Sequence, residues 1–180
     1  MALSATIYKV QLNISDMDRH YYAEHQLTVA RHPSETEERM MVRLLAFMFH
    51  ADERLEFTRG LCADEEPEIW LKDYSDAIEL WIEVGLPEEK RLRKACGRAQ
   101  KVVLYSYGGY AAQLWWQRQQ PALQRYDNLQ VIEIPEIACG SLATLAKRSM
   151  HLQVTIQDGH VWVDNGNETL EVIAEVRYGA

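Results

Sequence analysis

An alternating run from Ile78 to Pro87, followed at once by a basic segment from Lys90 to Lys101, limits the folds open to this chain. Read as a β-strand, the run places its aliphatic residues on one face, which belongs to a core: Ile78, Leu80, Ile82 and Val84. The opposite face carries Glu79, Trp81 and Glu83. Two carboxylates beside an indole and a basic segment suit metal-dependent phosphodiester chemistry, but they also suit a solvated sheet face, and the residues leave both open.

Strand and helix patterns follow one another along the rest of the chain. Strands are predicted at 8–14, 25–29, 68–71, 77–86, 101–107, 129–134, 152–157, 160–164 and 170–176. Helices are predicted at 34–50, 87–97, 110–119 and 136–148. The Asp158-Gly159 and Asn165-Gly166 pairs are typical of hairpin turns between the last three strands. The patterns predict an α/β protein of the mixed α+β kind, with an N-terminal β-hairpin and a C-terminal β-meander.

The first predicted helix has a capping-box signal, with Ser34 as N-cap and Glu37 three residues later. Its apolar residues occupy most of the helical circumference, so the helix should be buried on several sides. Pro121 is expected to end the helix at 110–119, because proline lacks the backbone N–H that a helix interior needs.

Composition sets the class of protein. The chain has 180 residues, of which 47% are apolar, enough for a single domain spanning 1–180. Its net charge of -8 argues against indiscriminate coating of nucleic acid and leaves room for a local basic patch between Lys90 and Lys101. No signal peptide or membrane span is apparent, so a cytoplasmic protein without a membrane partner is expected. The residues do not indicate an oligomeric state.

The order of elements from about residue 35 to 135 resembles the αβββαβ core, with a mixed sheet, of the PD-(D/E)XK or restriction-endonuclease-like superfamily. In that superfamily an acid lies on the strand after the first hairpin turn, and a second acid and a lysine lie two apart on the next strand. The first helix often adds a glutamate. Here Glu79 matches the first position and Glu38 matches the helical one. After Glu83, Gly85 stands where the lysine would be, and the strand at 101–107 has no acid.

Six segments distributed along the chain carry a further resemblance: Ala30 to Thr36, Ala51 to Leu55, Phe57 to Asp64, Leu80 to Glu83, Ala112 to Gln117, and Thr155 to Gly159. Through them the whole chain resembles the YaeQ family of small bacterial proteins. This resemblance implies a variant nuclease-like fold. The predicted function is a metal-dependent nuclease-like protein that uses Mg²⁺ or Mn²⁺ on nucleic acid. The alternative is a catalytically inactive binding or regulatory module that contacts nucleic acid or protein through Lys90 to Lys101.

Spacing limits how the acids share an ion. The Cα atoms of Glu79 and Glu83 are about 13 Å apart at ~3.3 Å per residue, whereas oxygen ligands lie about 2.0 to 2.6 Å from Mg²⁺ or Ca²⁺. The predicted metal ligands are therefore Glu79 or Glu83 together with Glu38 from the first helix. Glu35 and Glu37 compete for the helical role, although Glu37 also fits a cap and Glu35 also fits a first-turn acid that complements the helix dipole.

Two more side chains are candidates for the chemistry. Lys94 is proposed to replace the missing lysine by stabilising developing phosphate charge, although it also fits a solvated basic helix face. Gln113, on the second helix of the core, is proposed to orient the site, although it also fits a surface position. Trp115 and Trp116 either stack on bases or fill the core.

Overall fold

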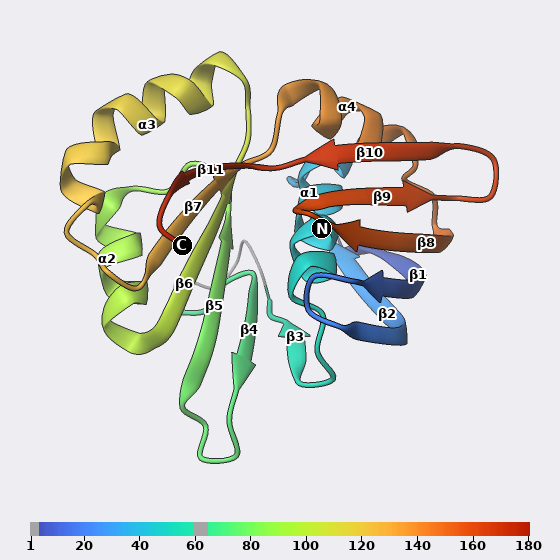
Figure 1. Cartoon of the computed structure of the whole chain (residues 1–180), viewed down its shortest axis with the longest axis horizontal. Helices are drawn as coiled ribbons and strands as arrows, with labels where there is room; N and C mark the ends of the chain where they lie inside the picture. Colours follow the sequence, from blue (N-terminus) through green and yellow to red (C-terminus); the bar gives the residue numbers. More distant parts are fainter. Residues whose placement is uncertain (1–3, 60–64) are drawn as a thin grey trace. The chain divides into compact units, whose positions relative to one another are not determined.

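The computed structural model describes residues 4–59 and 65–180, and its contacts divide the chain into two compact units. The first unit comprises Met1–Phe49 and Ile137–Ala174, and the second comprises His50–Glu136 and Glu175–Ala180. Each unit contains one β-sheet with helices (Figure 1), and both sheets mix parallel and antiparallel pairs. The predicted mixed α+β class is confirmed. A single domain spanning 1–180 stays a prediction.

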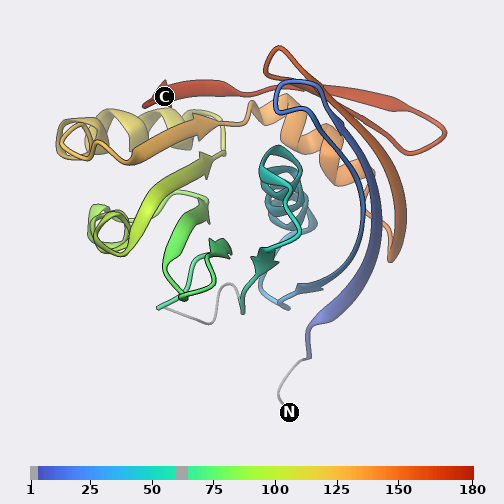
Figure 2. The same ribbon diagram turned by 60° about the horizontal axis from the view of Figure 1, so that its bottom comes forward.

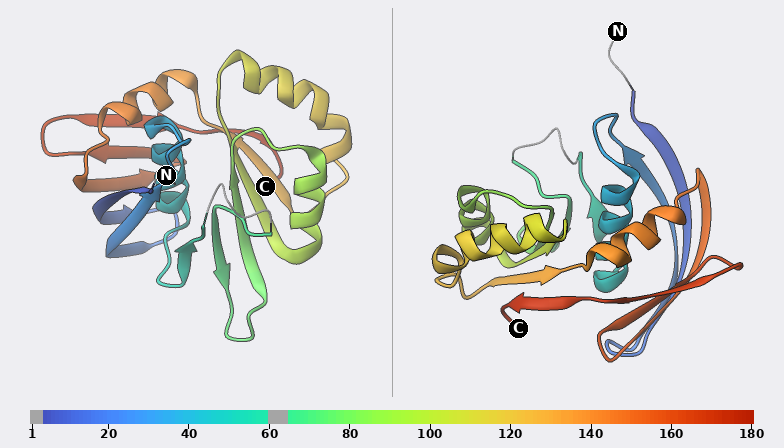
Figure 3. Two further views of the ribbon diagram at one scale, coloured as in Figure 1. Left: turned by 180° about the vertical axis from the view of Figure 1, so that it is seen from behind. Right: turned by 90° about the horizontal axis from the view of Figure 1, so that it is seen from above.

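The sheet of the first unit has the order β10-β9-β8-β1-β2. Its strands are β1 (Thr6–Asp16), β2 (Tyr21–Arg31), β8 (Ser149–Gln157), β9 (His160–Asp164) and β10 (Thr169–Ile173). The predicted hairpin and meander are therefore present, and the parallel pairing of β1 with β8 joins them into one sheet. This sheet curves around α1 (Glu37–His50) and α4 (Glu136–Thr144), as Figures 2 and 3 show.

Helix α1 is buried over most of its circumference, as predicted. Its buried residues form a continuous run from Met40 to Met48. Its N-cap differs from the prediction: the Thr36 hydroxyl accepts a hydrogen bond from the Arg39 N–H at 3.1 Å, whereas Ser34 bonds to the His32 ring, its N–H lying 3.1 Å from Nδ1. The cap lies two residues later than Ser34 because the preceding residue, Glu35, turns inward.

Glu35 forms a buried ion pair inside the first unit. Its carboxylate lies 2.7 Å from Arg43 Nε and 2.9 Å from Arg43 Nη2, and Arg39 Nη1 is 3.2 Å from Oε1. Arg43 also donates to the Ala30 carbonyl at 3.0 Å. Arg43 on α1 therefore binds both the Glu35 carboxylate and the end of β2, and its bonds to the two carboxylate oxygens fix its guanidinium in place.

The sheet of the second unit has the order β11-β7-β6-β5-β4-β3. Its strands are β3 (Leu55–Phe57), β4 (Ile69–Lys72), β5 (Ile78–Val84), β6 (Ala99–Ser106), β7 (Leu129–Glu133) and β11 (Glu175–Tyr178). The first three form an antiparallel meander, and β5, β6 and β7 run parallel. Helices α2 (Glu89–Arg98) and α3 (Tyr110–Leu123) cover the same sheet face (Figure 2). Residues such as Trp81, Leu92, Leu104, Trp115 and Val131 form the core between them.

Several predicted boundaries are wrong. Strands β3 and β11 were not predicted, α4 ends at Thr144 instead of residue 148, and α3 continues to Leu123. Pro121 lies inside the last turn of α3 and does not end it. Leu123 is fully buried in the core cluster, and its burial offsets the hydrogen bond that the proline removes.

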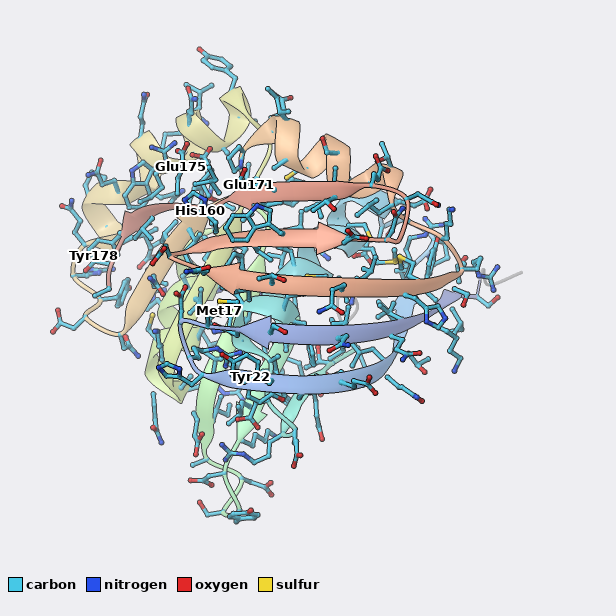
Figure 4. The ribbon with its side chains drawn as sticks, turned by 45° about the vertical axis from the view of Figure 1, so that its right-hand side comes forward. Met17, Tyr22, His160, Glu171, Glu175 and Tyr178 are labelled. Carbon is cyan, nitrogen blue, oxygen red and sulfur yellow. The ribbon has the colours of Figure 1, made fainter. Side chains whose placement is uncertain are left out.

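The outer face of the first unit's sheet is polar. Figure 4 shows His160 on β9 beside Glu171 on β10, and His160 Nδ1 lies 2.8 Å from Glu171 Oε1. Tyr22 on β2 also lies on the surface and is 62% exposed. Side chains that alternate between buried and exposed along a strand are typical of a sheet with one buried and one solvated face. In the part of the chain that the structure describes, no helix has the length and apolar character needed to span a membrane.

Candidate functional site

The site lies in the second unit, where the strand β5 departs from a simple alternation. The β4–β5 ladder pairs Leu71 with Leu80 and then slips to pair Lys72 with Ile78, which places Glu79 at a β-bulge. A bulge shifts the side-chain alternation by one residue, so Ile78 joins Trp81 in the core cluster under α2 and α3. The prediction that Ile78 shares a face with Leu80 is therefore wrong.

Glu83 is buried, and protein groups contact both of its oxygens. Its exposed fraction is 2%, so the solvated-face alternative is wrong for this residue. The Trp81 indole N–H donates to Oε1 at 2.8 Å, and Arg91 Nε lies 3.0 Å from Oε2. Arg91 comes from the first turn of α2, the element that follows β5 in the chain. Arg91, from the basic segment, therefore forms an ion pair with Glu83 on β5.

Glu68 is a second buried carboxylate next to Glu83. It directly precedes β4, it is 3% exposed, and its N–H donates to the Ile82 carbonyl at 3.0 Å. Burial raises the pKa of Glu83, and the like charge of Glu68 raises it further, while the bonds from Arg91 and Trp81 oppose these effects. Paired acids in a desolvated setting are a common property of functional sites.

The other predicted site residues lie elsewhere. Glu79 has a side chain that is 35% exposed and lies 3.4 Å from Arg54 Nη1. Lys94 forms an ion pair with the carboxylate of Glu65. Gln113 is exposed on α3. Arg91, not Lys94, therefore supplies the cation beside Glu83.

Glu38 belongs to the first unit, on the first turn of α1, where it is half-buried. Its part in a metal site stays a prediction. Among residues 4–59 and 65–180, no three His, Cys, Asp or Glu side chains gather so as to hold an ion. Glu68 and Glu83 could therefore supply two carboxylate ligands to an ion. Carboxylate oxygens suit Mg²⁺ and Mn²⁺, and Mg²⁺ usually binds through one or two carboxylates, with waters and substrate phosphates completing its shell.

The tryptophans of α3 contact the protein itself. Trp115 is 9% exposed, and its indole N–H donates to the Pro87 carbonyl at 2.8 Å. Trp116 packs against Tyr178 with ring centroids 6.5 Å apart. These contacts favour the core-filling alternative over stacking on bases.

Sequence reasoning missed Glu68 as a site residue. The residues at 68–71 predict a strand, but the sequence does not predict β3, which has only three residues, so 68–71 is taken as the first strand of the hairpin. The available signal was the Pro67-Glu68 pair directly before an alternating run. With β3 counted, Glu68 precedes the second strand of the meander and Glu83 lies on the third.

The fold and site define a mixed α+β protein with a buried acid pair and an arginine at one end of a sheet. A family model described as "YaeQ protein" matches residues 1–174. The "Uncharacterized protein YaeQ" of Escherichia coli (strain K12) is 51% identical over 172 residues, which are 96% of this chain and 95% of that protein. Its Salmonella typhi counterpart is 50% identical with the same coverage. The chain belongs to the YaeQ family.

Solved structures agree with this assignment. The crystal structure of the YaeQ protein from Xanthomonas axonopodis pv. citri has a TM-score of 0.95 and 48% identity, covering 98% of this chain and all of that one. The YaeQ protein from Pseudomonas syringae has a TM-score of 0.94 and 38% identity, covering 98% and 97% of the two chains. Both comparisons cover 98% of this chain and therefore include residues of both units.

Proposed function

We propose that this protein is a metal-dependent, nuclease-like phosphodiesterase whose metal ligands are Glu68 and Glu83. The observation that carries the proposal is that Glu68 and Glu83 are both buried, come from segments joined by the hydrogen bond from the Glu68 N–H to the Ile82 carbonyl, and repel each other as like charges, with Arg91 paired to Glu83. Burying charges is unfavourable unless partners or a metal compensate. Two buried carboxylates of like charge beside each other are therefore an arrangement that a bound divalent cation would stabilise.

The order of the elements supports the same proposal. Along the chain, α1 is followed by the meander β3–β4–β5, then by α2 and the parallel strand β6. This is the order of the PD-(D/E)XK core that the sequence resembles. Glu68 then takes the place of the first motif acid and Glu83 the place of the second. Gly85 occupies the lysine position, and Arg91 brings a positive charge to the site from α2.

Each side chain has a defined part in this chemistry. A bound divalent ion would polarise a phosphoryl oxygen and lower the pKa of a water molecule. Glu68 and Glu83 would hold that ion, and Trp81 orients Glu83 through the indole N–H. Arg91 is placed to stabilise negative charge that develops on the phosphate. A carboxylate has about four lone-pair positions, so Glu83 can keep its bonds to Trp81 and Arg91 and still bind an ion.

One observation favours the alternative function, a binding module without activity. Both Glu83 oxygens already have partners in the protein, Trp81 and Arg91. In this alternative the ion pair fastens α2 to β5 and takes no part in catalysis. Nucleic acid or protein would then bind at the basic segment, and no metal would be needed.

Cleavage of labelled oligonucleotides separates the two functions. We expect the purified protein to cleave at least one of single-stranded DNA, duplex DNA or RNA with Mg²⁺ or Mn²⁺. Glu83→Gln should lower the rate by at least about tenfold, as for loss of a group acting in the transition state. Glu79→Gln is the matched control, because it makes the same change on the same strand outside the pair. Activity that survives both Glu68→Gln and Glu83→Gln would assign the cleavage to another site or to a contaminant.

A further inference from the structure

Three basic residues of α2 contact the same short acidic segment. Arg91, Lys94 and Arg98 are spaced so that they follow one side of the helix. Arg98 Nη1 donates to the Glu65 carbonyl at 2.6 Å, and Arg91 Nη2 donates to the Glu66 carbonyl at 2.8 Å. Lys94 forms an ion pair with the Glu65 carboxylate. We call Arg91, Lys94 and Arg98 the α2 stripe.

The charge distribution along the chain is strongly uneven in this region. Residues 90–126 contain eight of the 19 Lys and Arg residues and no Asp or Glu. An anion for the α2 stripe must therefore come from another part of the chain or from a ligand. Glu83 supplies it for Arg91, and Glu65 supplies it for Lys94 and Arg98. The hydrogen bond from Lys94 lowers the pKa of the Glu65 carboxyl.

The contact between the stripe and Glu65 is open to solvent. The Glu65 side chain is 70% exposed, and those of Lys94 and Arg98 are 45% and 39% exposed. Exposed ion pairs of this kind are weak and are readily screened by salt. A competing anion can therefore replace the Glu65 carboxylate without disturbing the core.

We propose that the α2 stripe binds the phosphodiester backbone of nucleic acid and that Glu65 occupies the stripe as an internal competitor. A guanidinium pairs with phosphate in a planar, two-bond geometry, and lysine adds a point charge. From Arg91 to Arg98 the helix rises about 10 Å at ~1.5 Å per residue, so the stripe can follow more than one phosphate. The choice of nucleic acid as the polyanion rests on the proposed function, whereas the competition by Glu65 does not.

The test measures binding without cleavage. Fluorescence anisotropy of labelled single-stranded DNA, RNA and duplex DNA is recorded at low salt in EDTA, so metal binding and hydrolysis do not contribute. Glu65→Gln should bind at least one of these probes about two- to fivefold more tightly than the unsubstituted protein, as expected for removal of an exposed ion-pair partner. Glu168→Gln is the matched control, since it makes the same charge change at an exposed position of the first unit.

A second substitution locates the effect. Lys94→Gln should weaken binding and reduce its salt dependence, because one fewer phosphate is neutralised. In the double variant, Lys94→Gln should also reduce the gain from Glu65→Gln, and Arg98 accounts for the part that is left. If Glu65→Gln binds no more tightly than Glu168→Gln, or if neither binds any probe, the inference is wrong. EDTA is present throughout, so the anisotropy result does not depend on whether the protein cleaves nucleic acid. A negative anisotropy result would contradict the competition by Glu65 and would say nothing about metal binding by Glu68 and Glu83.

Discussion

At the scale of one residue, the burial of Glu35 makes Thr36, and not Ser34, the N-cap of α1. The Thr36 hydroxyl satisfies the Arg39 N–H at the start of α1. We expect Thr36→Ala to lower the free energy of unfolding by about 1 kcal/mol, the usual value for losing an N-cap. Ser34→Ala should have a smaller effect, since Ser34 is exposed and bonds to His32, two residues before it in the chain. Urea unfolding followed by circular dichroism measures both, and an equal loss in the two variants would contradict this assignment.

The same scale shows why the sequence indicated the wrong cap and only part of the candidate site. Ser34 and Glu37 match a capping box, but the burial of Glu35 with Arg43 is a tertiary contact that no local pattern contains. Glu83 was predictable, because it lies on an alternating strand beside a basic segment. Its partner Glu68 was not identified, because the three-residue strand β3, which makes β4 the second strand of the meander, was not predicted.

At the scale of elements, Asp18 joins two turns of the first unit. From the β1–β2 turn it accepts hydrogen bonds from the N–H groups of Asp158 and Gly159, at 2.8 and 2.9 Å. These bonds lower the pKa of Asp18. Its ionised form therefore stabilises the fold above the ordinary aspartate pKa, and that stabilisation is lost as the pH falls through the lowered value.

This linkage gives a prediction about pH. Asp18→Asn should be less stable than the unsubstituted protein at neutral pH, and the difference should shrink in acid, where the native carboxyl becomes protonated. Urea-unfolding midpoints across that pH range measure it. Asp127→Asn, at another exposed aspartate, is the control and should show a smaller pH-dependent difference. A difference for Asp18→Asn that stays constant with pH would show that the ionised carboxylate is not what joins the turns.

Elements were predictable where local chemistry determines them. The Asp158-Gly159 turn was correctly predicted, and both residues have the positive φ angles, 54° and 77°, that such a hairpin needs. The face of β5 was not predictable in full, because the bulge at Glu79 depends on pairing with β4. The end of α3 was missed for a similar reason, since Leu123 is held by a core that the local sequence does not reveal.

At the scale of the whole molecule, pairings between distant segments give the protein its two sheets. The N-terminal hairpin and the C-terminal meander share a sheet through the β1–β8 pair, and the last strand, β11, pairs with β7 in the other sheet. Hydrophobic alternation predicts strands but does not identify their partners. The fold class was therefore predictable from the sequence, and the sheet orders were not.

The central claim is that Glu68 and Glu83 together bind a divalent metal ion. Calorimetric titration of the purified protein with Mn²⁺ tests it most directly. We expect binding in the unsubstituted protein and in Glu79→Gln, and loss of binding in Glu68→Gln and in Glu83→Gln, with thermal unfolding confirming that each variant is folded. Absence of binding to the unsubstituted protein, or binding that Glu83→Gln leaves unchanged, would contradict the account.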